Sequence, residues 1–236
     1  TVELGAGTGK FTKSLLARYP EFSKGYIAVE PAEAFRHSLQ EDFPDMEILD
    51  ALADSLSSIP DNSISAVMCG QSFHWMATSD TLQELQRILK PNSPLIMIWN
   101  TASRNVSWQA ELEHKIILPH YGDTVPRQQS YQWRECFVND SQNAVARKCY
   151  QNASIETFRN VEATPGKQIP FEMHQDIIDR VLSISVISAK SPEVHEMVAE
   201  QIEQLISTHS DTRDVQRNKY VMKYITELCW VYTNPS

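Results

Sequence analysis

The stretch VELGAGTGKFT, residues 2–12, decides the fold, because it joins a short apolar run to a loop that contains three glycines. Gly5, Gly7 and Gly9 alternate with other residues, and a run with helical spacing of apolar side chains follows. Glycine has no Cβ, so such a loop lets a ligand approach the backbone and adopts positive φ at little cost. A strand, a glycine turn and a helix in this order are typical of the first β-α unit of a ligand-binding sheet.

Strands and helices alternate through the first hundred residues. Apolar runs of strand length occupy residues 1–4, 25–30, 46–49, 63–70 and 94–100. Helical patterns lie between them, over residues 10–20, 31–43 and 78–91. We place Pro31 in the first turn of the second helix, where proline is tolerated. This alternation predicts a Rossmann-like, doubly wound α/β fold with a mostly parallel sheet, which binds ligands at the carboxyl ends of its strands.

The pattern changes after Asn100. Residues 104–150 are expected to form helices rich in aromatic side chains, and residues 154–174 a hairpin around Pro165 and Gly166. Two further helices are expected over 174–188 and 191–209, and a long closing strand over 220–232. We therefore expect a ligand-binding core over residues 1–100. Residues 101–236 would form a helical substrate cap, with closing strands that complete the sheet.

Charge and composition restrict the classes of partner. The formal net charge is −9 and the Lys and Arg residues are scattered, which argues against a nucleic-acid partner. The longest apolar runs have strand length, so we expect no membrane span. The four cysteines show no C-x-x-C spacing, so we expect no metal site, and a reduced, cytoplasmic protein is the simpler interpretation. Thr1 falls inside an expected strand, so we expect further sequence before it.

The glycine loop fails two common nucleotide-binding patterns. A P-loop would need Gly where Leu4 stands and Ser or Thr where Phe11 stands. A dinucleotide fingerprint would need Gly at Lys10, which argues against a nicotinamide-dependent oxidoreductase. What remains is E-x-G-x-G-x-G, in which Glu3 can serve an ammonium group rather than a pyrophosphate.

Glu30 ends the second expected strand, 23 residues after Gly7. A carboxylate at this place binds both hydroxyls of a ribose. The alternative to a ligand site is a glycine turn with a purely structural role. Against it, the loop and Glu30 indicate a ligand independently of one another. A nucleoside with a zwitterionic amino-acid tail fits both features.

Four stretches together resemble a known family, in the order VELGAGTGKFT, IAVEP, LADSLSSIPDNSISAVMCGQSFHW and LQRILKPNSPLIMIWN. They are similar to the successive motifs of class I S-adenosylmethionine-dependent methyltransferases, in the small-molecule branch that includes trans-aconitate methyltransferase-like proteins. The resemblance implies a seven-stranded sheet with a cap and S-adenosylmethionine as cofactor. Such proteins also carry an N-terminal helical lid, which these residues do not contain.

The resemblance also implies roles for single residues. Gly5, Ala6 and Gly7 would pass under the methionine part of the cofactor, with Glu3 near its amino group and Glu30 on its ribose.

Two further loops would complete the cofactor site. Ala53 would meet the adenine edge through its backbone N–H, and Asp54 could accept from the exocyclic amine. Related sequences often have Asp at the position of Leu52, so this chain departs from the family there. Gln71 and Ser72 would lie beside the sulfonium.

Catalytic and substrate residues follow less directly. His74 could act as a general base, or it could be a histidine bonded to the loop backbone. Trp75, Trp99 and Trp133 could line an apolar substrate pocket or belong to the core. Ser183 could contact substrate, or its hydroxyl could bond back to its own helix.

These features together favour methylation of a small, partly apolar organic molecule on a carboxylate or hydroxyl oxygen. A carboxylate acceptor would need no base. The alternative is a protein of this fold that binds S-adenosylmethionine without transferring its methyl group. The sequence gives no indication of the oligomeric state.

Overall fold

The structure is a computed structural model, and it describes residues 1–122, 125–127, 130–137, 149–151, 158–160, 168–171, 174–209, 212–214 and 219–235. The chain forms two compact units. Unit 1 comprises Thr1–Trp99, Pro126–Phe158 and Glu227–Ser236, and unit 2 comprises Asn100–Val125 and Arg159–Thr226. Residues beyond the first hundred thus join the predicted core, since two later segments belong to unit 1.

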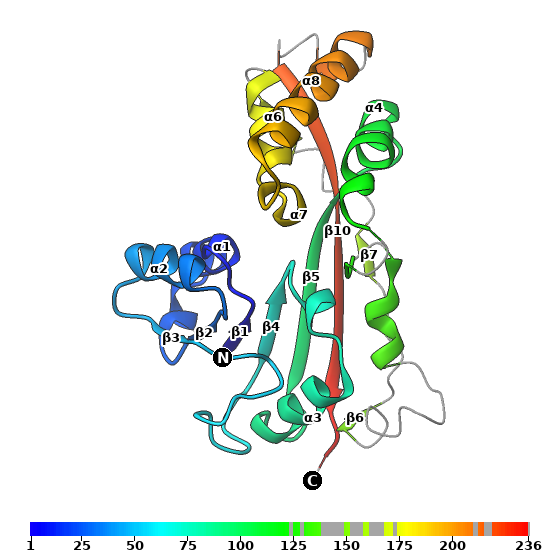
Figure 1. The fold of residues 1–236 in the computed structure, drawn as a ribbon. Coiled ribbons are helices and arrows are strands. Elements are labelled where there is room, and N and C mark those ends of the chain that lie inside the picture. Colours follow the sequence, from blue (N-terminus) through cyan, green and yellow to red (C-terminus); the bar gives the residue numbers. More distant parts are fainter. Residues whose placement is uncertain are drawn as a thin grey trace. The chain divides into compact units, whose positions relative to one another are not determined.

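A mostly parallel sheet forms the centre of unit 1 (Figure 1). Its strands follow the spatial order β3 (Glu47–Leu49), β2 (Ile27–Val29), β1 (Val2–Leu4), β4 (Val67–Gly70), β5 (Pro94–Ala102), β10 (Lys219–Thr233) and β6 (Tyr150–Gln151). The first five are parallel neighbours, with Glu3 opposite both Ala28 of β2 and Met68 of β4. Strand order reverses at β1, which is where such sheets bind ligands.

Strand β10 supplies residues to both units, as β5 does. In unit 1 the Thr233 N–H donates to Ser93 O at 3.0 Å, and in unit 2 the Ser103 N–H donates to Lys223 O at 2.8 Å. The two strands are therefore antiparallel. We expected seven strands; the described part of the chain has ten, seven along the path above and three that pair with β10.

Three α-helices of unit 1 connect the parallel strands: α1 (Lys10–Arg18), α2 (Glu33–Asp42) and α3 (Ser79–Ile88). Helix α3 begins where the Thr78 side chain accepts from the Thr81 N–H, and it buries Leu82, Leu85 and Ile88 as its spacing predicts. Helix α2 begins at Glu33, so placing Pro31 in its first turn was wrong. Pro31 lies in the extended segment that leaves β2, and Ala32 occupies the N-cap position.

Short 3-10 helices complete the described helical elements of unit 1: η1 (Pro20–Ser23), η2 (Phe73–Trp75) and η6 (Gln132–Cys136). The core of this unit packs the apolar strands against α3 and against the segment that contains η6. Trp133 of η6 lies with its ring centroid 4.6 Å from that of Trp99. Aromatic packing therefore holds the second of the three segments that build unit 1, Pro126–Phe158.

Unit 2 is largely helical. Its described helices are α4 (Ser107–Glu111), the π-helix η3 (Leu112–Ile117), the 3-10 helix η4 (Leu118–His120), α6 (His174–Leu182), α7 (Ser185–Ser188) and α8 (Pro192–Thr208). Three strands pair with β10: β7 (Phe158–Asn160), whose first residue belongs to unit 1, β8 (Gln168–Phe171) and β9 (Arg213–Asp214). The predicted turn at Pro165 and Gly166 lies outside the described residues. In the described part of the chain, no helix has the length and apolar character that crossing a membrane requires.

Candidate functional site

The glycine loop lies between β1 and α1, at the carboxyl end of the sheet. Gly5, Gly7 and Gly9 have φ angles of 64°, 58° and 79°, which only glycine adopts easily. The N–H groups of Gly5 and Ala6 both donate to Val29 O, at 2.8 and 3.1 Å, which fastens the loop to the end of β2.

The three glycines differ in what surrounds them. A Cβ at Gly5 would lie 2.6 Å from Ser72 Cβ, and one at Gly9 would lie 2.5 Å from Leu39 Cδ1. A Cβ at Gly7 would meet nothing within 4 Å. Gly5 and Gly9 are therefore required by packing, whereas the backbone of Gly7 faces space that a ligand can enter.

Glu30 follows β2 directly and reaches the glycine loop. Its carboxylate accepts from the Gly7 N–H at 2.8 Å through Oε2 and from the Ala32 N–H at 2.9 Å through Oε1. A carboxylate can accept about four hydrogen bonds, so two positions remain for ligand hydroxyls. The structure thus brings together the two features that indicated a nucleoside in the sequence.

Glu3 is fully buried below the loop rather than exposed in it. Its Oε2 accepts from the hydroxyls of Thr12 and Tyr26, both at 2.6 Å, while Oε1 makes no hydrogen bond in the described part of the chain. Burial raises the pKa of Glu3. Glu3 therefore ties α1 and the residue that precedes β2 to β1, and its contact with the cofactor's amino group stays a prediction.

The carboxyl end of β4 carries Gln71 and Ser72. The Ser72 hydroxyl donates to Leu4 O at 2.6 Å and is buried, so it joins the ends of β4 and β1. Gln71 is exposed and has a φ of 63°, a left-handed conformation that side-chain-bearing residues rarely adopt. Strained backbone of this kind is concentrated at functional sites. Gln71, rather than Ser72, therefore presents its side chain at this edge of the sheet.

His74 makes a hydrogen bond that limits its chemistry. The Trp99 Nε1–H donates to His74 Nδ1 at 3.2 Å, so the only lone pair of the neutral ring is occupied and Nε2 carries the proton. Burial lowers the pKa of His74 to about 4, so the ring is neutral at pH 7. This arrangement makes His74 a hydrogen-bond donor toward a ligand and leaves it no free lone pair with which to act as a base.

The remaining predicted substrate residues have different surroundings. Trp99 and Trp133 are buried with their rings in contact, tilted by 34°, so they belong to the core of unit 1, while Trp75 is 47% exposed. Ser183 lies in unit 2, and its exposed hydroxyl donates to Arg180 O at 2.8 Å. The Ser183 hydroxyl thus bonds back to its own helix, which is the alternative to substrate contact given above.

Three residues of unit 1 that the sequence did not single out lie next to this aromatic group. Tyr131 donates to the buried Glu227 carboxylate at 3.0 Å, and the Arg134 guanidinium lies 4.2 Å from the Tyr131 ring centroid and 5.3 Å from that of Trp133. The one signal in the sequence that could have indicated this group is Glu227, a carboxylate within the apolar run of β10. Tyr131 also has a left-handed φ of 57°.

Comparisons with known proteins agree with this geometry. Residues 2–97 match the family described as "Methyltransferase domain". A methyltransferase-like protein of Schizosaccharomyces pombe is 38% identical over 138 residues, which cover 58% of this chain and 51% of that protein. An uncharacterized methyltransferase of Mycobacterium bovis is 25% identical over 225 residues, which cover 95% of this chain and 79% of that protein. Residues 2–97 form a class I S-adenosylmethionine-dependent methyltransferase domain.

Solved structures of other proteins have a similar fold over the whole of this chain. The YcgJ protein of Bacillus subtilis has a TM-score of 0.55 at 13% identity, covering 100% of this chain and 92% of that one. The [4+2]-cyclase SpnF has a TM-score of 0.51 at 13% identity, covering 100% of this chain and 75% of that one. The chain spans about half the length of its two S. pombe relatives, 51% and 41%. The resemblance to the trans-aconitate branch stays a prediction.

The described residues of the methyltransferase domain fit S-adenosylmethionine, its cofactor. Gly7 offers open space beside a left-handed backbone, and Glu30 keeps acceptor positions for a ribose. Ala53 and Asp54 lie in a turn whose N–H groups make no hydrogen bond within the described part of the chain. These residues would hold the three parts of the cofactor, the amino-acid tail, the ribose and the base.

The low pKa of His74 predicts a pH-dependent stability of the methyltransferase domain. Between pH 6.5 and 4 the unfolded chain takes up a proton at His74 that the folded chain refuses, so stability is lost as pH falls. A pKa lowered from 6.5 to about 4 corresponds to about 3 kcal/mol. Urea unfolding of the native chain and His74→Gln at pH 7, 5.5 and 4.5 measures this.

The His74→Gln variant should lose less stability than the native chain between pH 7 and pH 4.5. Its amide oxygen can still accept from Trp99 Nε1–H, and the other titrating groups contribute equally to both proteins. The same pH dependence in both proteins would contradict the assignment of a neutral, partly buried His74.

Proposed function

We propose that this protein is an S-adenosylmethionine-dependent methyltransferase that methylates a small organic molecule on oxygen, at a carboxylate or hydroxyl. The observation that carries the proposal is the hydrogen bond from the Gly7 N–H to Glu30 Oε2, which joins the open glycine loop to a ribose-binding carboxylate. The methyltransferase domain over residues 2–97 and its match to named methyltransferases support the reaction class.

The roles of the chain's own residues follow from their positions. When bound, S-adenosylmethionine supplies an electrophilic methyl group, so the protein's contribution is alignment and exclusion of water. Glu30 and the glycine loop would orient the nucleoside and its tail. His74, with Nε2–H as a donor, would orient an acceptor oxygen. Gln71 follows β4, the strand next to β1, so it lies beside the glycine loop at the carboxyl end of the sheet.

An acidic substrate is favoured by Arg134. Its guanidinium lies over the Tyr131 ring and 4.0 Å from Glu227, and its side chain is 30% exposed, so it adds positive charge near this surface. Trp75, which is 47% exposed, favours a substrate with an apolar part. A small molecule fits this surface better than nucleic acid does, because the formal net charge of the chain is −9. We also propose a cytoplasmic location, because all four cysteines are described, buried and outside any disulfide bond.

A second candidate is a protein that binds S-adenosylmethionine without transferring its methyl group. The likeness to the [4+2]-cyclase SpnF supports this second candidate, because that protein has the same fold and is named for an activity other than methyl transfer. Product analysis separates the two candidates. Incubation with S-adenosylmethionine and a panel of small carboxylic acids and alcohols should release S-adenosylhomocysteine and a methyl ester or ether. Binding of cofactor with no methylated product from any panel member would favour the second candidate.

Gly7→Ala should weaken S-adenosylhomocysteine binding by more than about tenfold, because the added methyl group enters the space assigned to the ligand. Calorimetric titration measures the dissociation constant. Gly25→Ala is the matched control, since Gly25 also has a left-handed φ, 70°, and open space around it. Gly25 precedes β2, so it lies at the amino end of the parallel strands, away from the glycine loop. Equal losses of affinity in both variants would show backbone strain alone and contradict the cofactor site at Gly7.

A further inference from the structure

We propose that Arg87 and Glu84 of α3 are positioning residues that set the selectivity of the site for adenine, by holding the loop that follows β3. This loop, residues 50–61, is called the post-β3 loop below. The inference rests on the proposed use of S-adenosylmethionine and adds residues that do not touch it.

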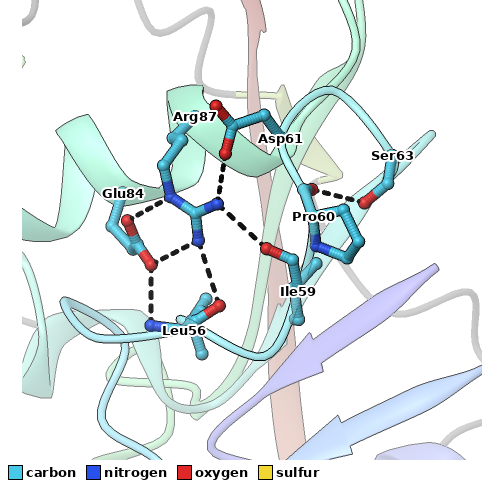
Figure 2. A network of polar contacts seen from close by, with 7 residues as sticks. All are labelled: Leu56, Ile59, Pro60, Asp61, Ser63, Glu84 and Arg87. Carbon is cyan, nitrogen blue, oxygen red and sulfur yellow. Dashed lines mark hydrogen bonds and ion pairs between the residues drawn. The ribbon is translucent and has the colours of Figure 1, made fainter.

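Arg87 uses all of its donors on this loop and on Glu84 (Figure 2). Its Nε and one Nη2 hydrogen go to the two oxygens of Glu84, at 2.8 and 2.7 Å. The others go to the carbonyls of Leu56 and Ile59, at 3.0 and 2.9 Å, and to Asp61 Oδ1 at 2.5 Å. A guanidinium has five N–H donors, so each one has an acceptor.

Glu84 fixes the same point of the loop from the other side. Its Oε1 accepts from the Leu56 N–H at 2.7 Å, so both backbone groups of Leu56 are held by α3. The hydrogen bonds from Arg87 lower the pKa of Glu84, which keeps it ionised. The helix therefore determines the backbone position of Leu56.

Leu56, which α3 holds in this way, directly follows a turn. The Ser55 N–H donates to Leu52 O at 3.1 Å, so Ala53 and Asp54 are the central residues of a turn that runs directly into Leu56. Neither central N–H makes a hydrogen bond within the described part of the chain. A shift of Leu56 would move these two N–H groups together.

The strand order places this turn where a base would lie. Strand β3 neighbours β2 on the side away from β1, so the order across the carboxyl edge is glycine loop, Glu30, post-β3 loop. A nucleoside with its ribose at Glu30 and its amino-acid tail at the glycine loop must extend its base toward the end of β3. Arg36 holds the beginning of the post-β3 loop, donating to Asp50 Oδ2 at 2.7 Å, and Arg87 holds its end.

The experiment compares two ligands that differ at one edge of the base. S-adenosylhomocysteine carries the 6-amino group of adenine, and S-inosylhomocysteine carries an oxygen in its place. We expect the native chain to prefer the first by about tenfold or more, because a site built to hydrogen-bond one edge rejects the analogue that lacks it. In Arg87→Met the preference should fall below about threefold, with the larger loss in affinity for S-adenosylhomocysteine.

Asp61→Asn is the matched control. It alters the exposed end of the same network, where Asp61 is 69% exposed, and leaves the bonds to Leu56 and Ile59 in place. Its preference should equal that of the native chain. A merely structural role for Arg87 would lower the affinity for both ligands by the same factor and would overturn the proposal.

Further measurements cover the remaining outcomes. If Arg87→Met does not fold, Arg87→Lys keeps the charge but cannot reproduce the five-donor fork, so it should also lose the preference. In Glu84→Ala the Leu56 amide should exchange hydrogen faster than in the native chain, together with a lower preference; unchanged values of both would overturn the proposal. No binding of S-adenosylhomocysteine by the native chain would overturn the cofactor assignment itself, and this inference with it.

Discussion

Glu30→Ala is expected to weaken S-adenosylhomocysteine binding by at least about 100-fold. Hydrogen bonds to a charged group contribute about 1.5–3 kcal/mol each, and two ribose hydroxyls would be lost together. The Glu30 carboxylate lies 2.8 Å from the Gly7 N–H, so its removal also frees the loop that would carry the methionine part. Isothermal titration calorimetry of the native chain and the variant measures the change.

Glu30→Gln separates the charge from the shape. Its amide oxygen can still accept from the Gly7 N–H, but the neutral group is a weaker acceptor for a hydroxyl, so we expect an affinity between those of the native chain and Glu30→Ala. Thermal unfolding without ligand checks that both variants fold. Native affinity in a folded Glu30→Ala would show that no ribose is bound at this carboxylate.

Gly5→Ala is expected to destabilise the chain by about 3 kcal/mol, as the sum of two costs. The left-handed φ of 64° disfavours any side chain, by about 1–2 kcal/mol. The new Cβ would also lie 2.6 Å from Ser72 Cβ, which is close to the backbone and cannot rotate away, and overpacking of this kind costs about 1–3 kcal/mol. Urea unfolding monitored by tryptophan fluorescence measures the loss.

Gly25→Ala isolates the first of these costs, because its φ of 70° is similar and nothing lies within 4 Å of the added Cβ. We expect it to destabilise the chain by only about 1 kcal/mol. If both variants lost the same stability, the close approach of β1 and β4 at Ser72 would contribute nothing.

The sequence allowed the sheet and its helices to be predicted because their signals are local. Alternation of apolar runs and amphipathic helices indicated the mostly parallel order that the structure confirms. The spacing of Leu82 and Leu85 placed α3 within a residue of its observed beginning. The meeting of the glycine loop and Glu30 was also predictable, because consecutive parallel strands end at the same edge.

The other contacts could not be predicted, because they join residues far apart in the sequence. Nothing near His74 in the chain reveals that Trp99 occupies its Nδ1, which reverses the chemistry expected of a free imidazole. Tyr131 and Glu227 are 96 positions apart, and no periodic pattern connects them. Arg87 resembles an ordinary exposed residue of an amphipathic helix until the loop that it holds is seen.

The shared strand β10 has a consequence for any attempt to study the motifs in isolation. Residues 1–100 carry all four characteristic stretches, yet Thr233 forms the hydrogen bonds beside Ser93 at the start of β5. A fragment that ended near Asn100 would leave β5 as a long apolar edge strand, which is a template for aggregation. The smallest autonomous folding fragment therefore has to include the last ten residues of the chain, and the recognisable signature is shorter than the unit that can fold.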